Sequence, residues 1–191
     1  MYHPAQGSTY NEEEYEYIEL KNIGVSSLLL DNVKLSNGIY YTFADSAGLY
    51  LASGDRIVIV RNQTAFAERY STGGMNIAAG EYTGYLDNGG EEIKLDDYTN
   101  STILEFDYND DRYPITDGAG FSLTIVDETN SDLDSWDDMD NWRSSSVMGG
   151  TPDTDDTGHV ADNGAIVINE VLTHTDDLTY GDWIELHNTT G

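Results

Sequence analysis

Carboxylates are the side chains of this sequence that are best placed to do chemistry. Residues 127–140 read DETNSDLDSWDDMD, and hard oxygen ligands at short spacing suit Ca²⁺. A calcium site formed by Asp132, Asp134, Asp137 and Asp138 is one interpretation, and a solvated loop is the other. The stretch has no glycine at the sixth position and no glutamate at the twelfth, which excludes an EF-hand. The sequence requires no cofactor, and Ca²⁺ is the single candidate.

Catalysis is a weaker interpretation of the same side chains. Pairs such as Glu91 with Glu92 or Asp110 with Asp111 resemble the two carboxyl groups of a glycosidase, which stand about 5–10 Å apart. With 36 acidic residues in the chain, however, close pairs arise without any chemistry. The four histidines all lie near the chain ends, and there is no cysteine, so no nucleophile has a base beside it. We therefore predict that the chain is not an enzyme.

The net charge of the chain limits the classes of partner and the cellular locations that we expect for it. The formal net charge is −28, which repels nucleic acid phosphates and anionic membrane surfaces. No apolar run reaches the roughly 18 residues needed to cross a bilayer, so we expect neither nucleic acid binding nor membrane insertion. A fold with this much self-repulsion needs screening salt or bound cations. An extracellular or cell-surface location would supply both.

The hydrophobic pattern predicts an all-β fold with at most one short helix. Short apolar runs alternate with Gly, Asn, Asp and Ser at the spacing of a β-sandwich. Residues 64–70 form the one helical window, with Thr64 as its expected N-cap. Residues 92–96 have the alternation of a half-buried edge strand, and residues 141–152 have no strand or helix periodicity. The expected strands are 17–20, 28–35 with a turn at Asp31-Asn32, 55–60, 92–96, 102–108 and 121–126.

An internal repeat predicts how the chain is divided. Residues 17–22 read YIELKN and residues 183–188 read WIELHN. The second phrase is preceded by the strand-like run 166–171, IVINEV, whereas Met1 falls where Leu172 falls in the second copy. We therefore expect a domain over residues 1–152 that lacks its first strand, an acidic linker over 153–163, and the opening strands of a second, truncated repeat over 164–191.

Several phrases in sequence order resemble the lamin tail domain in its bacterial and archaeal extracellular version. They are Ile168-Asn169-Glu170, the repeated phrase above, residues 35–38, 86–95 and 117–123, Asn141-Trp142-Arg143-Ser144-Ser145, and Gly150-Thr151-Pro152. The resemblance implies an immunoglobulin-like β-sandwich without enzymatic activity, used as an interaction or spacer module. It also implies structural roles for the motif residues Glu19, Asn22, Trp142 and Arg143.

A sandwich without its first strand exposes unpaired backbone groups that favour the recruitment of another strand. The chain carries a replacement at its far end, formed by Ile166, Val167, Ile168, Asn169, Glu170 and Val171. We expect this run to dock on the first domain, within one molecule or by exchange with a neighbouring molecule, which would give self-association. The alternative is that the segment hangs free.

The 14 tyrosines leave two interpretations open. Burial at the sandwich is what we expect of Tyr17, Tyr40 and Tyr108, whereas exposed tyrosines beside aspartates would suit a protein or carbohydrate partner. Taken together, the sequence predicts a non-catalytic interaction or structural spacer module of a larger secreted or cell-surface protein. The alternative is a calcium-dependent or carbohydrate-binding accessory module of a secreted hydrolase.

Overall fold

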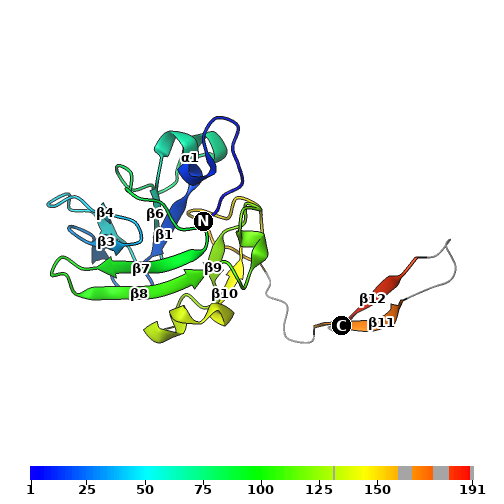
Figure 1. Ribbon diagram of the computed structural model, residues 1–191. Coiled ribbons are helices and arrows are strands. Elements are labelled where there is room, and N and C mark those ends of the chain that lie inside the picture. The colour runs from blue at the N-terminus through cyan, green and yellow to red at the C-terminus, as the bar shows by residue number, and fades with distance from the viewer. Residues whose placement is uncertain (131, 159–164, 174–180, 190–191) are drawn as a thin grey trace. The chain divides into compact units, whose positions relative to one another are not determined.

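The computed structural model describes residues 1–130, 132–158, 165–173 and 181–189. The chain forms two units, Met1–Gly158 and His159–Gly191, and each is described by itself. Antiparallel strands dominate, and the described residues contain one α-helix (Figure 1). The prediction of an all-β fold with at most one short helix is confirmed. Among the described residues, no helix combines the length and the apolar character that a membrane span requires.

The first unit contains one four-stranded sheet and three two-stranded sheets, all antiparallel. The larger sheet has the order β4-β3-β7-β8, with β4 at Tyr41–Thr42, β3 at Lys34–Asn37, β7 at Gly90–Asp96 and β8 at Thr102–Asn109. The strand pairs are β1 (Tyr17–Lys21) with β6 (Arg56–Val60), β2 (Leu28–Leu29) with β5 (Tyr50–Leu51), and β9 (Leu123–Ile125) with β10 (Trp142–Ser144). Short 3-10 helices cover Glu12–Tyr15, Pro114–Thr116, Leu133–Asp137 and Met139–Asn141.

Two strand predictions are wrong. Residues 92–96 were expected to form an edge strand, but β7 is paired on both sides, with β3 and with β8. The alternation of apolar and polar residues in β7 shows that one of its faces is buried. In an antiparallel sheet, a central strand and an edge strand can both have one solvated face, so this pattern does not distinguish them. Residues 142–144 were expected to be irregular but form β10, which is too short to show a period.

The single α-helix, α1, covers Gln63–Arg69, and its N-cap lies two residues earlier than predicted. Asn62 rather than Thr64 is the N-cap. The Asn62 Oδ1 accepts hydrogen bonds from the backbone amides of Thr64 at 2.9 Å and Ala65 at 3.0 Å. Asparagine and threonine both serve as N-caps, and the extended backbone of Asn62 makes it the last residue before the helix.

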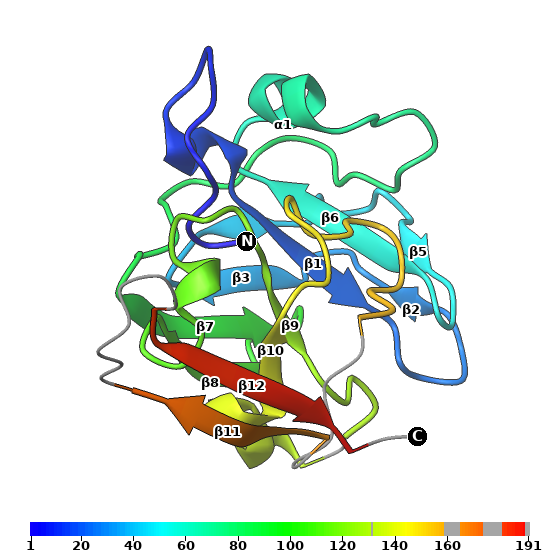
Figure 2. The same ribbon diagram turned by 90° about the vertical axis from the view of Figure 1, so that its right-hand side faces the viewer.

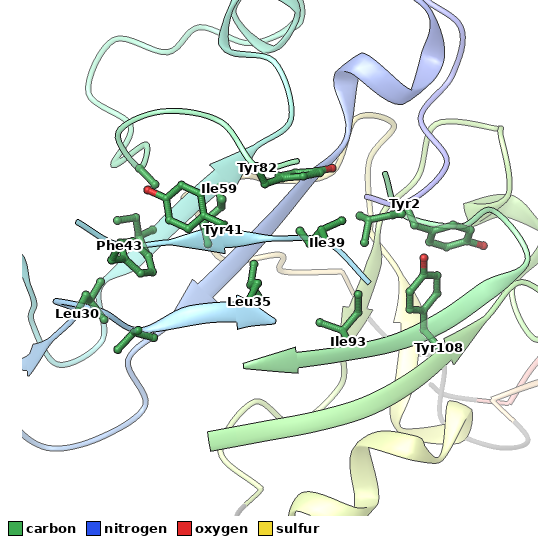
Figure 3. Packing of buried hydrophobic residues seen from close by; sticks show 14 of the residues in the cluster. Tyr2, Leu30, Leu35, Ile39, Tyr41, Phe43, Ile59, Tyr82, Ile93 and Tyr108 are labelled. Atoms are coloured by element: carbon green, nitrogen blue, oxygen red, sulfur yellow. The ribbon is translucent and has the colours of Figure 1, made fainter. Parts of the chain in front are cut away.

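β6 connects two layers of the core because both of its faces are buried. Ile57 and Ile59 belong to the main cluster, which also holds Leu35 and Ile93 of the four-stranded sheet. Figure 3 shows Ile59, Leu35 and Ile93 among the side chains buried between the strands. The alternate β6 residues pack with Phe66 of α1 in a second cluster. The sequence predicted a strand with two buried faces here from its continuous apolar run, and the burial is confirmed. It also predicted a central strand, but among the described strands β6 pairs only with β1. Two packed antiparallel layers are compatible with an immunoglobulin-like β-sandwich.

The second unit is a β-hairpin of β11 (Ile166–Leu172) and β12 (Trp183–Asn188). The strands are antiparallel, and a β-bulge lies between Ile168 and Glu170. The large apolar side chains of the hairpin are all exposed by 39% or more. A two-stranded hairpin without a packed face is marginally stable in water, so this unit has apolar surface that folding by itself does not bury.

Candidate functional site

The aspartates that were predicted as calcium ligands lie on or beside two 3-10 helices. The Asp137 Oδ1 accepts a hydrogen bond from the Asp107 amide at 2.8 Å, and the Asp138 Oδ1 accepts one from the Asp140 amide at 2.9 Å. Asp132 and Asp134 stand at the start of the helix Leu133–Asp137. Within the described ranges, no three acidic or histidine side chains are grouped so as to hold a metal ion. The calcium site stays a prediction.

The carboxylate pair Glu91 and Glu92 has structural contacts on both faces of β7. Neighbouring residues of a strand point to opposite faces, which separates the two carboxyl groups. The Glu91 Oε1 accepts a hydrogen bond from the Tyr108 hydroxyl at 3.3 Å, and the Glu92 Oε1 accepts one from the Asn37 amide group at 2.5 Å. These contacts give the pair a role in sheet stability, and the non-enzyme interpretation stays a prediction.

The tyrosines divide between core and surface. Tyr17 and Tyr108 are buried, as expected. Tyr40 is 57% exposed, so its predicted burial is wrong. It lies between the buried residues Ile39 and Tyr41, and alternation in an extended segment turns its ring outward. The part of the chain that the structure describes shows no ring contact for Tyr40, and a carbohydrate surface stays a prediction.

The motif residue Asn22 holds the turn that follows β1. Its side chain is buried, and its Nδ2 donates hydrogen bonds to the carbonyls of Ser26 at 2.9 Å and Leu51 at 2.8 Å. Its Oδ1 accepts one from the Gly24 amide at 2.9 Å. A side chain that satisfies three backbone groups at once fixes the end of β1, and the motif role implied by the resemblance stays a prediction.

Glu19 has contacts on the face of β1 opposite to the main core. Its Oε1 lies 3.2 Å from the Arg56 Nε, and its Oε2 accepts a hydrogen bond from the Asp153 amide at 2.5 Å. Burial raises the pKa of Glu19 to about 7, although these hydrogen bonds oppose the change. The residue thereby fastens the segment after Pro152 to β1.

Trp142 and Arg143 fix the end of the first unit. The Trp142 Nε1 donates to the Trp136 carbonyl at 2.8 Å, and its ring stacks on Phe106 with centroids 5.2 Å apart. The Arg143 guanidinium donates to the Asp156 carboxylate at 2.7 Å and to the Asp156 carbonyl at 2.8 Å. Paired charge-assisted hydrogen bonds of this kind are strong, so the two motif residues close the fold.

The first unit continues beyond the domain boundary predicted at residue 152. The Asp156 carboxylate is nearly buried, at 4% exposure, and its Oδ2 accepts a hydrogen bond from the Ser146 amide at 2.8 Å. Residues 153–158 of the predicted linker 153–163 therefore have ordered contacts within the first unit. Residues 159–164 lie outside the described residues.

One edge of β1 is nearly free of partners in the described chain. β1 pairs with β6 along its other edge (Figure 2). On the free side, the Met1 amine donates to the Tyr17 carbonyl at 3.1 Å, and the Tyr17 amide donates to the Met1 carbonyl at 3.3 Å. Peptide groups alternate in direction along an antiparallel strand, so those of Glu19 and Lys21 point to the same side as those of Tyr17. No strand of the described residues pairs with them. We call this row, from Tyr17 to Asn22, the β1 edge.

An apolar cleft of about 620 Å³ runs beside the β1 edge. Ile18 and Leu20 of β1 line it together with residues of β7, β8, β9 and β10, and both also pack against the main core. Several exposed apolar side chains lie along the same cleft: Ile23, Leu28, Leu29, Tyr98, Ile103 and Leu133. Exposed apolar patches of this kind mark interaction sites. A free strand edge beside an apolar cleft offers both main-chain hydrogen bonds and side-chain burial to an extended segment.

In the second unit, the strand that repeats the β1 sequence has a partner along the corresponding edge. β12 has the sequence phrase of β1, and β11 pairs with it from Ile166, opposite Asn188, to Leu172, opposite Trp183. Since Trp183 corresponds to Tyr17 in the repeat, the pair Leu172 with Trp183 corresponds to the pair Met1 with Tyr17. β11 thus occupies, on β12, the place that is free on β1 beyond Met1.

Sequence reasoning missed Glu16, which is fully buried below the β1 edge. Its Oε2 accepts hydrogen bonds from the Tyr82 hydroxyl at 2.7 Å and the Leu86 amide at 2.9 Å. Its Oε1 has no hydrogen-bond partner among the described residues. Burial raises the pKa of Glu16 to about 7, against the effect of these hydrogen bonds. The sequence feature that could have predicted the burial of Glu16 is its position between Tyr15 and Tyr17, directly before a strand.

Comparison of the chain with family models, curated proteins and solved structures gives no match. The resemblance to the lamin tail domain therefore stays a prediction. The functional argument depends on the β1 edge and the cleft.

Proposed function

We propose that the first unit is a non-catalytic interaction module of a larger secreted or cell-surface protein, and that it binds an extended segment as an added strand along the β1 edge. The observation that supports this function best is the coincidence of a free strand edge with an apolar cleft. Strand addition obtains affinity from the main chain and specificity from alternate side chains. Ile18 and Leu20 line the cleft and share the face of β1 that packs on the main core, so the residues of the bound segment opposite them would be apolar.

The net charge of −28 supports the same class of partner. It disfavours nucleic acid and anionic membranes, and it disfavours peptides with many acidic residues. An apolar strand with few acidic residues is the partner that the edge and the surrounding field favour together.

A peptide of alternating valine and threonine, labelled with fluorescein, tests the function without a known ligand. It should bind the full chain in a fluorescence anisotropy titration. The same peptide with a central proline should bind at least tenfold more weakly, because proline lacks the amide that a strand ladder needs. Equal binding of both peptides, or no binding of either, would contradict strand addition at this edge.

Two variants of the full chain make the titration specific. Leu20→Asp places a charge at the cleft and should abolish binding, whereas Val25→Asp changes a residue that is 99% exposed and outside the cleft, and should leave binding unchanged. The titration is repeated in a chain that carries Ile168→Asp, so that the hairpin of the protein itself does not compete with the peptide.

A further inference from the structure

We propose that the segment bound at the β1 edge is strand β11 of a second copy of this chain, so that two copies exchange strands. This inference rests on the proposed function and names its partner. Three observations carry it: the register that the repeat defines, the faces of the side chains, and the number of donor and acceptor strands in each copy.

The repeat defines the register of the added strand. On β12, Val171 lies opposite Ile184, Ile168 opposite Leu186 and Ile166 opposite Asn188. Replacing β12 by β1 at equivalent positions places the same three residues opposite Ile18, Leu20 and Asn22. Leu172 would coincide with Met1, which already exchanges two hydrogen bonds with Tyr17. The added strand therefore covers the β1 edge from Ile18 to Asn22 and ends at Val171.

The bulge in β11 decides which of its side chains enter the cleft. Without an irregularity, residues 166, 168 and 170 would share one face. The bulge between Ile168 and Glu170 shifts the pattern by one residue, so that Val171 takes the place of Glu170. Directly opposite residues of a pair share a face, so Ile166, Ile168 and Val171 all lie on the cleft side of β1. Glu170 is kept out of the apolar cleft.

The exchange would move the apolar side chains of β11 from an exposed position in the hairpin to a buried position at the β1 edge. In the hairpin, Ile166 is 58% exposed, Ile168 is 63% exposed and Val171 is 47% exposed, because neither face of the pair is packed. At the β1 edge the same side chains meet the cleft of about 620 Å³, a size within the range of binding pockets. The strand pairing is similar in both places, and the difference in apolar burial favours β1.

In a pair of copies, the number of added strands equals the number of strand edges that receive them. Among the described strands, each copy offers one β1 edge and one β11, which gives up its pairing with β12. Two copies can therefore fill both edges reciprocally, and closure within single chains is the outcome that overturns the proposal. Such an exchange forms a closed two-fold dimer, the commonest symmetry of soluble oligomers and one that domain swapping readily produces.

Cysteine cross-linking tests the proposal cleanly because the chain has no cysteine. Leu20→Cys and Ile168→Cys are prepared as separate full-length chains, mixed in equal amounts and oxidised mildly. We expect a mixed disulfide between them in at least tenfold excess over the yield from Leu20→Cys with Val167→Cys, whose side chain is on the opposite face. Ile18→Cys with Val171→Cys is the second pair, in case Leu20→Cys disturbs folding.

Each outcome decides the question. A mixed disulfide in either pair supports the exchange. Yields equal to the Val167→Cys control in both pairs overturn it, as does a Leu20→Cys/Ile168→Cys double variant that closes only within single chains. If cross-linking fails while the valine-threonine peptide still binds, the partner is wrong and the proposed function stands. If the peptide fails as well, both are wrong.

Discussion

Replacing Glu16 with glutamine should remove a loss of stability that the native protein undergoes as pH rises from 4.5 to about 7. The pKa of this buried carboxyl is raised from 4.5 to about 7 in the folded state. Because the folded state binds the proton of Glu16 more tightly than the unfolded state does, protonation of this carboxyl stabilises the fold. This contribution is fully present below pH 4.5 and is lost as the pH rises through the pKa of Glu16 in the folded state. At about 1.36 kcal/mol per pH unit, a rise of this size corresponds to roughly 3 kcal/mol.

Glutamine is the matched substitution because its amide oxygen can accept the hydrogen bonds from the Tyr82 hydroxyl and the Leu86 amide. Its amide nitrogen takes the place of an oxygen without a partner, which costs about 1–3 kcal/mol at every pH. The diagnostic quantity is therefore the change in the free energy of unfolding between pH 5 and pH 8. This change should be about 2–3 kcal/mol smaller in Glu16→Gln than in the native chain.

Urea denaturation followed by tryptophan fluorescence at pH 5, 6, 7 and 8, at constant ionic strength, measures this change. The large negative charge of the chain also weakens folding as pH rises, so a control must remove one charge without the burial. Glu13→Gln does so three residues away, at a partly exposed position, and should keep the native pH dependence. The reasoning is refuted if Glu16→Gln shows the same loss between pH 5 and pH 8 as the native chain.

Three further predictions concern the anchors and the acidic loops. Asn22→Ala removes three buried side-chain hydrogen bonds and should lower the free energy of unfolding by about 3 kcal/mol in urea denaturation; a change below 1 kcal/mol would show that the turn is held by other contacts. Asn62→Ala removes the cap of α1 and should cost about 1 kcal/mol in the same assay, whereas Thr64→Ala, at the position predicted from sequence, should cost less. Calcium should raise the melting temperature no more than sodium at matched ionic strength, and a calcium-specific rise that Asp134→Asn removes would establish a site at residues 132–138.

The features that sequence reasoning predicted are local. Residues 57–60 are apolar at consecutive positions, and they form most of β6 because a strand with two buried faces needs no alternation. The tight turn at Asp31-Asn32 and the helix at residues 63–69 likewise depend on short stretches of sequence. Local pattern also identified the repeat, which later defined the register of β11.

The features that sequence reasoning missed depend on contacts between distant residues. The burial of Glu16 is set by Tyr82 and Leu86, which are 66 and 70 residues away. The cleft combines β1 with β7, β8, β9 and β10, and the periodicity of one short stretch cannot predict which distant strands will line a cleft together. The boundary at Gly158 was missed because an acidic, apolar-free segment is typical of a linker, whereas Asp156 is fixed by one arginine.

That arginine has a mechanical consequence for a module in a chain under tension. A pull on the residues after Gly158 loads Asp156 first, and Arg143 holds both its carboxylate and its carbonyl. Arg143 lies on β10, which is paired with β9, so the force passes into a sheet rather than into a loop. The segment 153–158 would have to detach from Arg143 before β10 separates from β9. The Arg143–Asp156 ion pair would therefore be the first contact to break at that end of the unit.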